Sequence, residues 1–209
     1  MGNSSVTSQA SSSVETDQQL GTLLVISGPS GVGKDSVWQV ASEQLTSFEK
    51  AITCTTRAQR EHEIEGIDYY FVSDEEFDRL LEDDQMLEWA KVHNARYGIP
   101  ASSVLTRLTA GEDVVCVIDV QGAFRLRSLF PQALLVFIKP PEAGTEILKK
   151  RLAQRGDITE EELMVRLKTA EWELLQTKQY DYEIINDTLE HAAAELCDII
   201  EKEKPKRAS

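Results

Sequence analysis

The chain has 209 residues, of which 41% are hydrophobic and 28% charged, a balance typical of one globular domain with its own core. Its formal net charge of −14 argues against broad binding to nucleic acid or to an acidic membrane, because both require a basic surface. No apolar run approaches the roughly 20 residues that span a membrane, and residues 1–20, rich in Ser and Gln, predict a disordered tail.

The first predicted elements are a strand, a glycine-rich loop and a helix. Residues 23–26 are apolar and predict a buried strand, and apolar residues recur with helical spacing over residues 37–45. Between them lies G-P-S-G-V-G-K-D-S, residues 28–36. A G-x-x-x-x-G-K pattern in this context predicts a phosphate-binding loop, in which backbone N–H groups, the helix N-terminus and Lys34 hold phosphates. The alternative is a glycine-rich turn that binds nothing.

The residue after the lysine departs from this pattern. A Ser or Thr usually follows and holds Mg²⁺, but here Asp35 and then Ser36 follow. A carboxylate suits Mg²⁺ but repels phosphate. Either Asp35 holds the metal, directly or through water, or it points away and Ser36 or water takes its place.

A polar, charge-rich segment follows at residues 53–68, with Arg57 and Arg60 three residues apart. Isolated arginines of this kind are usually solvated surface charges. Next to a phosphate-binding loop we interpret them as a clamp, because guanidinium groups match phosphate oxygens bidentately. Residues 69–72 then predict a strand.

The next segment predicts a helix and a turn, and the apolar run between them contains one carboxylate, Glu88. Residues 73–76 have the pattern of a capping box and predict a helix start. Glu88 either faces outward from a strand or reads a guanine base, whose two adjacent N–H donors match two carboxylate oxygens. Residues 97–100 predict a turn that begins with Tyr97, and residues 102–108 predict a helix.

Two further core strands are predicted at residues 113–120 and 134–138. The first is apolar nearly throughout, as expected of a parallel strand covered on both faces. Asp119 lies at its carboxyl end, where open α/β sheets bind ligands, and is a candidate for contact with metal or substrate. The alternative is that Asp119 caps the helix that follows.

The carboxyl-terminal part predicts two basic helices, a strand at residues 182–185 and a final helix. Residues 159–162 form a second capping-box pattern, and the helix that they open has a clear amphipathic face. Basic residues from Arg151 to Lys168 either form a lid over phosphates or complement the helix dipoles.

This alternation of strands and helices predicts an α/β fold with a parallel sheet and right-handed crossovers. Residues 52–100 interrupt the alternation, so we interpret them as a lobe inserted into a core formed by residues 21–51 and 101–205. Cys54, Cys116 and Cys197 have no C-x-x-C spacing and predict reduced thiols in a cytoplasmic protein.

Taken in order, the motifs resemble those of guanylate kinases over residues 23–203. The motifs are G-P-S-G-V-G-K, T-T-R-A-Q-R, E-G-I-D-Y-Y-F-V, L-E-W-A, Y-G, D-V-Q-G, K-K-R-L-A-Q-R-G and I-I-N-D. The resemblance implies a P-loop NTPase-like parallel sheet with flanking helices, an inserted GMP-binding lobe and a helical lid at about residues 151–168. It also implies reversible transfer of the γ-phosphoryl of ATP to GMP, and to dGMP, with Mg²⁺. The sequence leaves the choice between a monomer and a homodimer open.

The resemblance further implies roles for individual residues. Those expected to hold ATP are Gly28, Pro29, Ser30, Gly31, Val32, Gly33, Lys34, Asp35 and Ser36, with Asn186 on the adenine side. Those expected to bind GMP are Thr53, Arg57, Arg60, Tyr69, Glu88, Tyr97 and Asp119, among which Thr53 and Glu88 read guanine. The expected catalytic residues are Lys34, Arg57, Arg151, Arg155 and Arg166, and the metal-ligand candidates are Asp35 and Asp119.

Two further positions depart from the family pattern. Val117 stands where the family commonly has a second acid, which leaves Glu88 and Asp119 to select guanine, and Ile99 stands where a small hydroxyl residue often helps to hold the GMP phosphate. The main alternative function is a catalytically inactive guanylate-kinase-like module that binds peptides. Only Asp35 favours it, whereas the presence of Lys34 and the paired arginines argues against it. A kinase for another phosphorylated acceptor is a second alternative.

Overall fold

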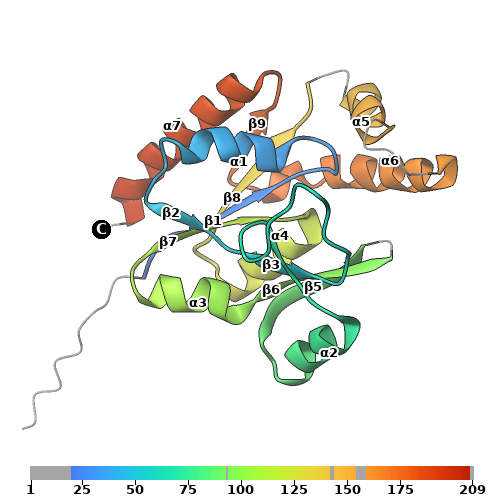
Figure 1. Cartoon of the computed structure of the whole chain (residues 1–209). Helices are drawn as coiled ribbons and strands as arrows, with labels where there is room; N and C mark the ends of the chain where they lie inside the picture. Colours follow the sequence, from blue (N-terminus) through green and yellow to red (C-terminus); the bar gives the residue numbers. More distant parts are fainter. Residues whose placement is uncertain (1–19, 93, 142–143, 154–158, 208–209) are drawn as a thin grey trace, which may run out of the picture.

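A five-stranded parallel sheet forms the centre of the part of the chain that the structure describes, and a smaller sheet lies beside it (Figure 1). The computed structural model describes residues 20–92, 94–141, 144–153 and 159–207. The strand order is β2-β7-β1-β8-β9, with every neighbouring pair parallel. These strands are β1 (Leu23–Ser27), β2 (Phe48–Lys50), β7 (Asp113–Val117), β8 (Leu134–Lys139) and β9 (Tyr182–Ile185). The predicted α/β fold is confirmed.

Helices cover both faces of this sheet, which explains why its strands are apolar without alternation. The covering helices are α1 (Lys34–Ser42), α3 (Ala101–Thr109), α4 (Val120–Leu129) and α7 (Leu189–Arg207). Leu24 and Ile26 of β1 belong to one core cluster, with buried residues of α1 and α7. Leu23 and Val25 belong to a second cluster, with residues of α3 and α4. Figure 1 shows the two helix pairs on opposite sides of the sheet.

A second sheet, of order β4-β3-β6-β5, lies between β2 and α3 in the chain, in the segment interpreted as a lobe. Its elements are β3 (Thr53–Thr55), β4 (Tyr69–Phe71), α2 (Asp74–Glu82), β5 (Met86–Val92) and β6 (Ala95–Pro100). The turn predicted at residues 97–100 is wrong, because Tyr97 and Gly98 pair with both β3 and β5. Gly98 serves packing here, since an added Cβ would lie 3.0 Å from Met86 Sδ and 3.1 Å from the Phe77 ring.

The remaining described helices are α5 (Gly144–Ala153), α6 (Glu160–Leu174) and the short 3₁₀ helix η1 (Thr177–Gln179). The capping box predicted at the start of α6 is confirmed by the reciprocal bonds of Thr159 and Glu162. The predicted strand over residues 113–120 ends at Val117, so Asp119 lies beyond it, at the start of α4. The tail at residues 1–19 and Arg155 lie outside the described residues. None of the described helices has the length and apolar character to cross a membrane.

The turn that follows β1 requires a glycine. Gly28 has a φ of +143°, and an added Cβ would lie 2.1 Å from the carbonyl oxygen of Ile138. We expect Gly28→Ala to lower the free energy of unfolding by at least about 2 kcal/mol, because it adds a steric overlap to an unfavourable φ. Gly66→Ala is the matched control, with a φ of +73° but a nearest contact at 3.8 Å; it should lose only about 1 kcal/mol. Denaturant unfolding measures both values, and equal losses would contradict this account of Gly28.

Candidate active site

A cavity of about 490 Å³ opens between the glycine-rich loop, the lobe and helix α6. It brings together many of the residues predicted from the sequence, namely Gly28, Ser30, Lys34, Asp35, Thr53, Tyr69, Glu88, Tyr97, Asp119 and Arg166. Four segments that are distant in the chain, the loop, the lobe, the start of α4 and helix α6, therefore contribute to one site.

The loop holds its own lysine in place. Lys34 is the first residue of α1, and its ammonium group donates to the carbonyl oxygens of Gly28 at 2.7 Å and Pro29 at 3.2 Å. Helix α1 begins there, so its N-terminal N–H groups and positive dipole end lie at the loop, as an anion site requires.

Two predicted ligand-contacting residues brace this loop. Asn186, only 1% exposed, donates from Nδ2 to the Val32 carbonyl at 2.7 Å. Arg151 of α5 donates from Nη1 to the same carbonyl at 2.9 Å. Neither residue lines the cavity, so their roles toward adenine and phosphate stay predictions. Their hydrogen bonds indicate that they also fix the shape of the loop.

Asp35, the departure from the loop pattern, lies at the edge of the cavity. Its side chain is 70% exposed and forms a 3.0 Å ion pair with Lys50. Ser36 is exposed as well. The role of Asp35 as a metal ligand stays a prediction. In this structure its negative charge is paired with Lys50.

Arg57 and two tyrosines form the cluster predicted to clamp phosphate. The Arg57 guanidinium donates two hydrogen bonds to the Glu63 carboxylate, from Nη2 to Oε1 at 2.7 Å and from Nη1 to Oε2 at 2.9 Å. Arg57 Nε donates to the hydroxyl of Tyr97 at 3.2 Å, and the Tyr69 ring lies 5.5 Å from the guanidinium carbon. Hydrogen bonding to Arg57 lowers the pKa of Glu63. Arg60 remains largely exposed, with its guanidinium 3.8 Å from Glu63.

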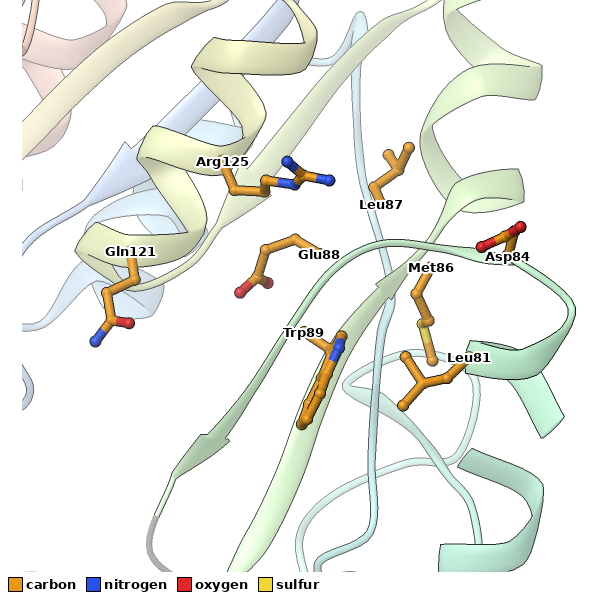
Figure 2. A pocket seen from close by; sticks show the side chains of 8 residues that line it. All are labelled: Leu81, Asp84, Met86, Leu87, Glu88, Trp89, Gln121 and Arg125. Atoms are coloured by element: carbon orange, nitrogen blue, oxygen red, sulfur yellow. The ribbon is translucent and has the colours of Figure 1, made fainter. Parts of the chain in front are cut away.

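Glu88 of β5 lies half-buried where the lobe meets helix α4. Burial, followed by the negative charge of Asp119, raises the pKa of Glu88 to about 7, whereas Arg125 acts in the opposite direction. Figure 2 shows its carboxylate directed toward Gln121 of α4, with Arg125 nearby on the same helix. Glu88 also lines a second cavity of about 500 Å³, together with Trp89 and Arg125.

Asp119 is the N-cap of α4. Its Oδ1 accepts a 2.8 Å hydrogen bond from the Gly122 backbone N–H, so the capping alternative is confirmed. Asp119 also lines the main cavity. Capping therefore fixes the carboxylate in the wall of the cavity.

Two acidic residues of this region, Glu63 and Glu173, are not among the site residues predicted from the sequence. Glu173 of α6 lines the main cavity and is only 6% exposed. Burial raises the pKa of Glu173 to about 7, with Lys34 and the Ser30 backbone N–H acting in the opposite direction and Asp119 in the same one. One signal was present, because Glu173 is three residues after Ala170 and so shares the apolar face of the helix. For Glu63 the loop sequence offers no such periodicity.

A family model, curated relatives and a solved structure all indicate the same protein family. A family model described as guanylate kinase matches residues 20–203. The guanylate kinase of Caldanaerobacter subterraneus is 42% identical over 184 residues, covering 88% of each chain. That of Bacillus subtilis is 40% identical over 191 residues, covering 91% of this chain and 93% of the other. The crystal structure of guanylate kinase from Anaplasma phagocytophilum matches with a TM-score of 0.71 at 33% identity, covering 89% of this chain and 87% of that one.

Proposed function

The chain belongs to the guanylate kinase family, whose reaction is phosphoryl transfer from ATP to GMP, and we propose that the cavity beside the glycine-rich loop carries out this reaction. The observation that supports this most directly is that Lys34 and Glu88 line one cavity. The phosphate-binding and base-reading functions therefore fit two ends of a single site. The acceptors are GMP and, as a further prediction, dGMP, and the products with GMP are ADP and GDP.

The ATP end of this site consists of the loop residues and Lys34. Loop N–H groups and the ammonium group would hold the phosphates, while Asn186 and Arg151 keep the loop in shape through the Val32 carbonyl. Arg166 of α6 lines the cavity and is suited to stabilising charge on the transferred group. Arg155, predicted to act with it, lies outside the described residues.

The GMP end consists of Glu88 and Thr53 for the base and the Arg57 cluster for the phosphate. Glu63 fixes the plane of the Arg57 guanidinium next to Tyr69 and Tyr97 before any phosphate arrives. Such preorganisation reduces the entropy lost when the substrate is aligned. Because the attacking group is a phosphate oxygen, the reaction needs alignment and charge neutralisation rather than a strong general base.

The guanylate kinase family uses a divalent metal with ATP, and we propose that the metal here is Mg²⁺. The residues present fit it, because the cavity wall contains carboxylate oxygens, the ligands that Mg²⁺ prefers, and one oxygen of Glu173 is buried without a hydrogen-bond partner among the described residues. When bound, Mg²⁺ would neutralise negative charge on the phosphates. Asp35 and Asp119 remain candidates to hold it.

The protein's three cysteines are buried and free of disulfides, which fits a reducing compartment. We therefore propose that the enzyme acts in the cytoplasm.

A bisubstrate inhibitor tests whether one cavity takes both nucleotides. Adenosine and guanosine joined through five phosphates should compete with both ATP and GMP in steady-state kinetics, because it would fill both ends of the site. Competition with ATP but not with GMP would contradict a shared cavity. Adenosine joined to itself through the same linker is the control, and it should inhibit more weakly because Glu88 faces the wrong base.

The ionisation of Glu88 gives a testable pH dependence. Its pKa is raised to about 7, so the carboxylate is protonated below that pH and loses one of the two acceptors that guanine needs. We expect the KM for GMP to rise as the pH falls through about 7.

A Glu88→Gln variant separates this effect from the titration of the GMP phosphate. It should raise the KM for GMP by about tenfold or more, as expected for a mismatched polar pair, and leave the KM for ATP within about twofold. The variant should also lose the part of the pH dependence that Glu88 causes. Equal effects on both KM values would argue that Glu88 does not read the base.

A further inference from the structure

Glu173 has an unusual position for an acidic residue. It lies in the wall of a phosphate-binding cavity, is 6% exposed, and its Oε2 has no hydrogen-bond partner among the described residues. A buried carboxylate without full compensation is costly, and a carboxylate beside a triphosphate adds repulsion. Both costs disappear if a cation lies between the carboxylate and the phosphates.

Other buried oxygens lie close to the same place. The buried hydroxyl groups of Ser27, the last residue of β1, and of Tyr180, after η1, face each other and have no hydrogen-bond partner among the other described residues. Burial raises the pKa of Tyr180, the Ser27 hydroxyl lowers it, and the charges of Glu173 and Asp119, which line the same cavity, add to the rise. A hydroxyl oxygen has two acceptor lone pairs, so this pair retains capacity to accept hydrogen bonds from the water ligands of a metal.

The position after Lys34 does not serve this purpose in the present structure. Asp35 is directed to Lys50, and its side chain is largely exposed. Among the residues that the structure covers, no three Asp, Glu, His or Cys side chains group closely enough to hold a metal by themselves. Mg²⁺ does not need such a group, because it keeps several waters and is usually held by one or two carboxylates together with substrate phosphates.

We propose that Glu173 of α6 and Asp119 at the start of α4 form the protein's side of the Mg²⁺ site, and hold the metal through its water ligands once ATP occupies the loop. This inference rests on the proposed function, since the ATP phosphates complete the site. It assigns Glu173 as a positioning residue. It also gives a reason for two acidic side chains in a cavity that receives phosphates.

Metal binding tests the proposal without relying on turnover. Mn²⁺ is titrated into the protein saturated with a non-hydrolysable ATP analogue, at about pH 8 so that carboxylates with a pKa near 7 are ionised, and free Mn²⁺ is followed by electron paramagnetic resonance. We expect Glu173→Gln to weaken Mn²⁺ binding to this complex by about 10- to 100-fold, the usual cost of losing an outer ligand. The amide keeps the size of the side chain and removes only its charge.

The matched control is Glu171→Gln, which removes the charge of an exposed residue of the same helix, and it should leave Mn²⁺ affinity unchanged. Binding of the analogue without metal should be unchanged or tighter in Glu173→Gln, because a negative charge has left the phosphate pocket. If Glu173 had only a structural role, the Glu173→Gln change would also weaken binding of the ATP analogue in the absence of metal.

Unchanged Mn²⁺ affinity in a folded Glu173→Gln protein would overturn the proposal. If that variant does not fold, as judged by circular dichroism, Asp119→Asn gives the same test, since Asn retains the capping ability, and unchanged affinity there would also overturn the site. The metal-binding test and the test of the proposed function can fail independently, because the Mn²⁺ affinity of the wild-type protein can be measured whether or not the protein phosphorylates GMP.

Discussion

Replacing Lys34 with Met is expected to lower kcat/KM by at least about 1000-fold, the upper range for loss of one preorganised charge-stabilising group. Lys34 begins helix α1, and the loop carbonyls of Gly28 and Pro29 hold its ammonium group at 2.7 and 3.2 Å. The phosphates of ATP would replace these neutral acceptors with charged ones. The interaction therefore strengthens as charge develops during transfer, and its loss should appear in kcat as well as in KM.

Lys178→Met is the matched control for this change. Lys178 is an exposed lysine of η1 that does not line the cavity, and its removal alters the net charge in the same way. We expect it to have near-wild-type kinetics. A Lys34→Met protein that folds and retains more than about a tenth of wild-type kcat/KM would contradict the assignment of the loop as the ATP site.

Replacing Arg57 with Ala is expected to lower kcat/KM by at least about 100-fold, as for the loss of one preorganised charge-assisted contact. Glu63, Tyr97 and Tyr69 fix the Arg57 guanidinium in one orientation. A guanidinium already held in place aligns the GMP phosphate without further ordering. Arg57→Lys should recover only part of the loss, because an ammonium group keeps the charge but cannot form the planar set of bonds to Glu63, Tyr97 and the Ala58 carbonyl that holds the guanidinium in place.

The control for Arg57 must separate substrate binding from stability. Arg57→Ala leaves Glu63, whose side chain is only 9% exposed, without its main partner, so thermal unfolding has to be followed in parallel. Arg79→Ala removes an exposed arginine from the same lobe, where it pairs with Glu76, and should have near-wild-type kinetics. Steady-state kinetics of a folded Arg57→Ala protein that match the wild type would rule out the clamp.

The parts of the fold that were predictable depend on local patterns. The glycine-rich loop, its flanking strand and helix, and the capping box at Thr159 are each contained in a few consecutive residues. Strand β2 was not predictable because it has three residues, of which only Phe48 is buried. Strand β6 looks like a turn because it contains Gly98 and Pro100, and only its packing against Phe77 and Met86 explains the glycine.

The candidate site was predictable as a set of residues but not as a set of contacts. Arg151 and Asn186 reach the Val32 carbonyl from 119 and 154 residues away along the chain, and no sequence pattern indicates such a meeting. The same holds for Glu63 and Arg57, which meet through an irregular loop. Asp119 shows the opposite case, because its capping bond to Gly122 is local and was foreseen as one of two alternatives.

The measurement that tests the central claim most directly is a coupled assay of ADP release. The protein is supplied with ATP and Mg²⁺, and GMP, AMP, CMP and UMP are offered separately. We predict efficient turnover with GMP and none of comparable rate with the other three, because only guanine presents two adjacent donors to Glu88. Absence of turnover with all four, in a protein shown to be folded, would contradict the account and favour the alternative of an inactive peptide-binding module.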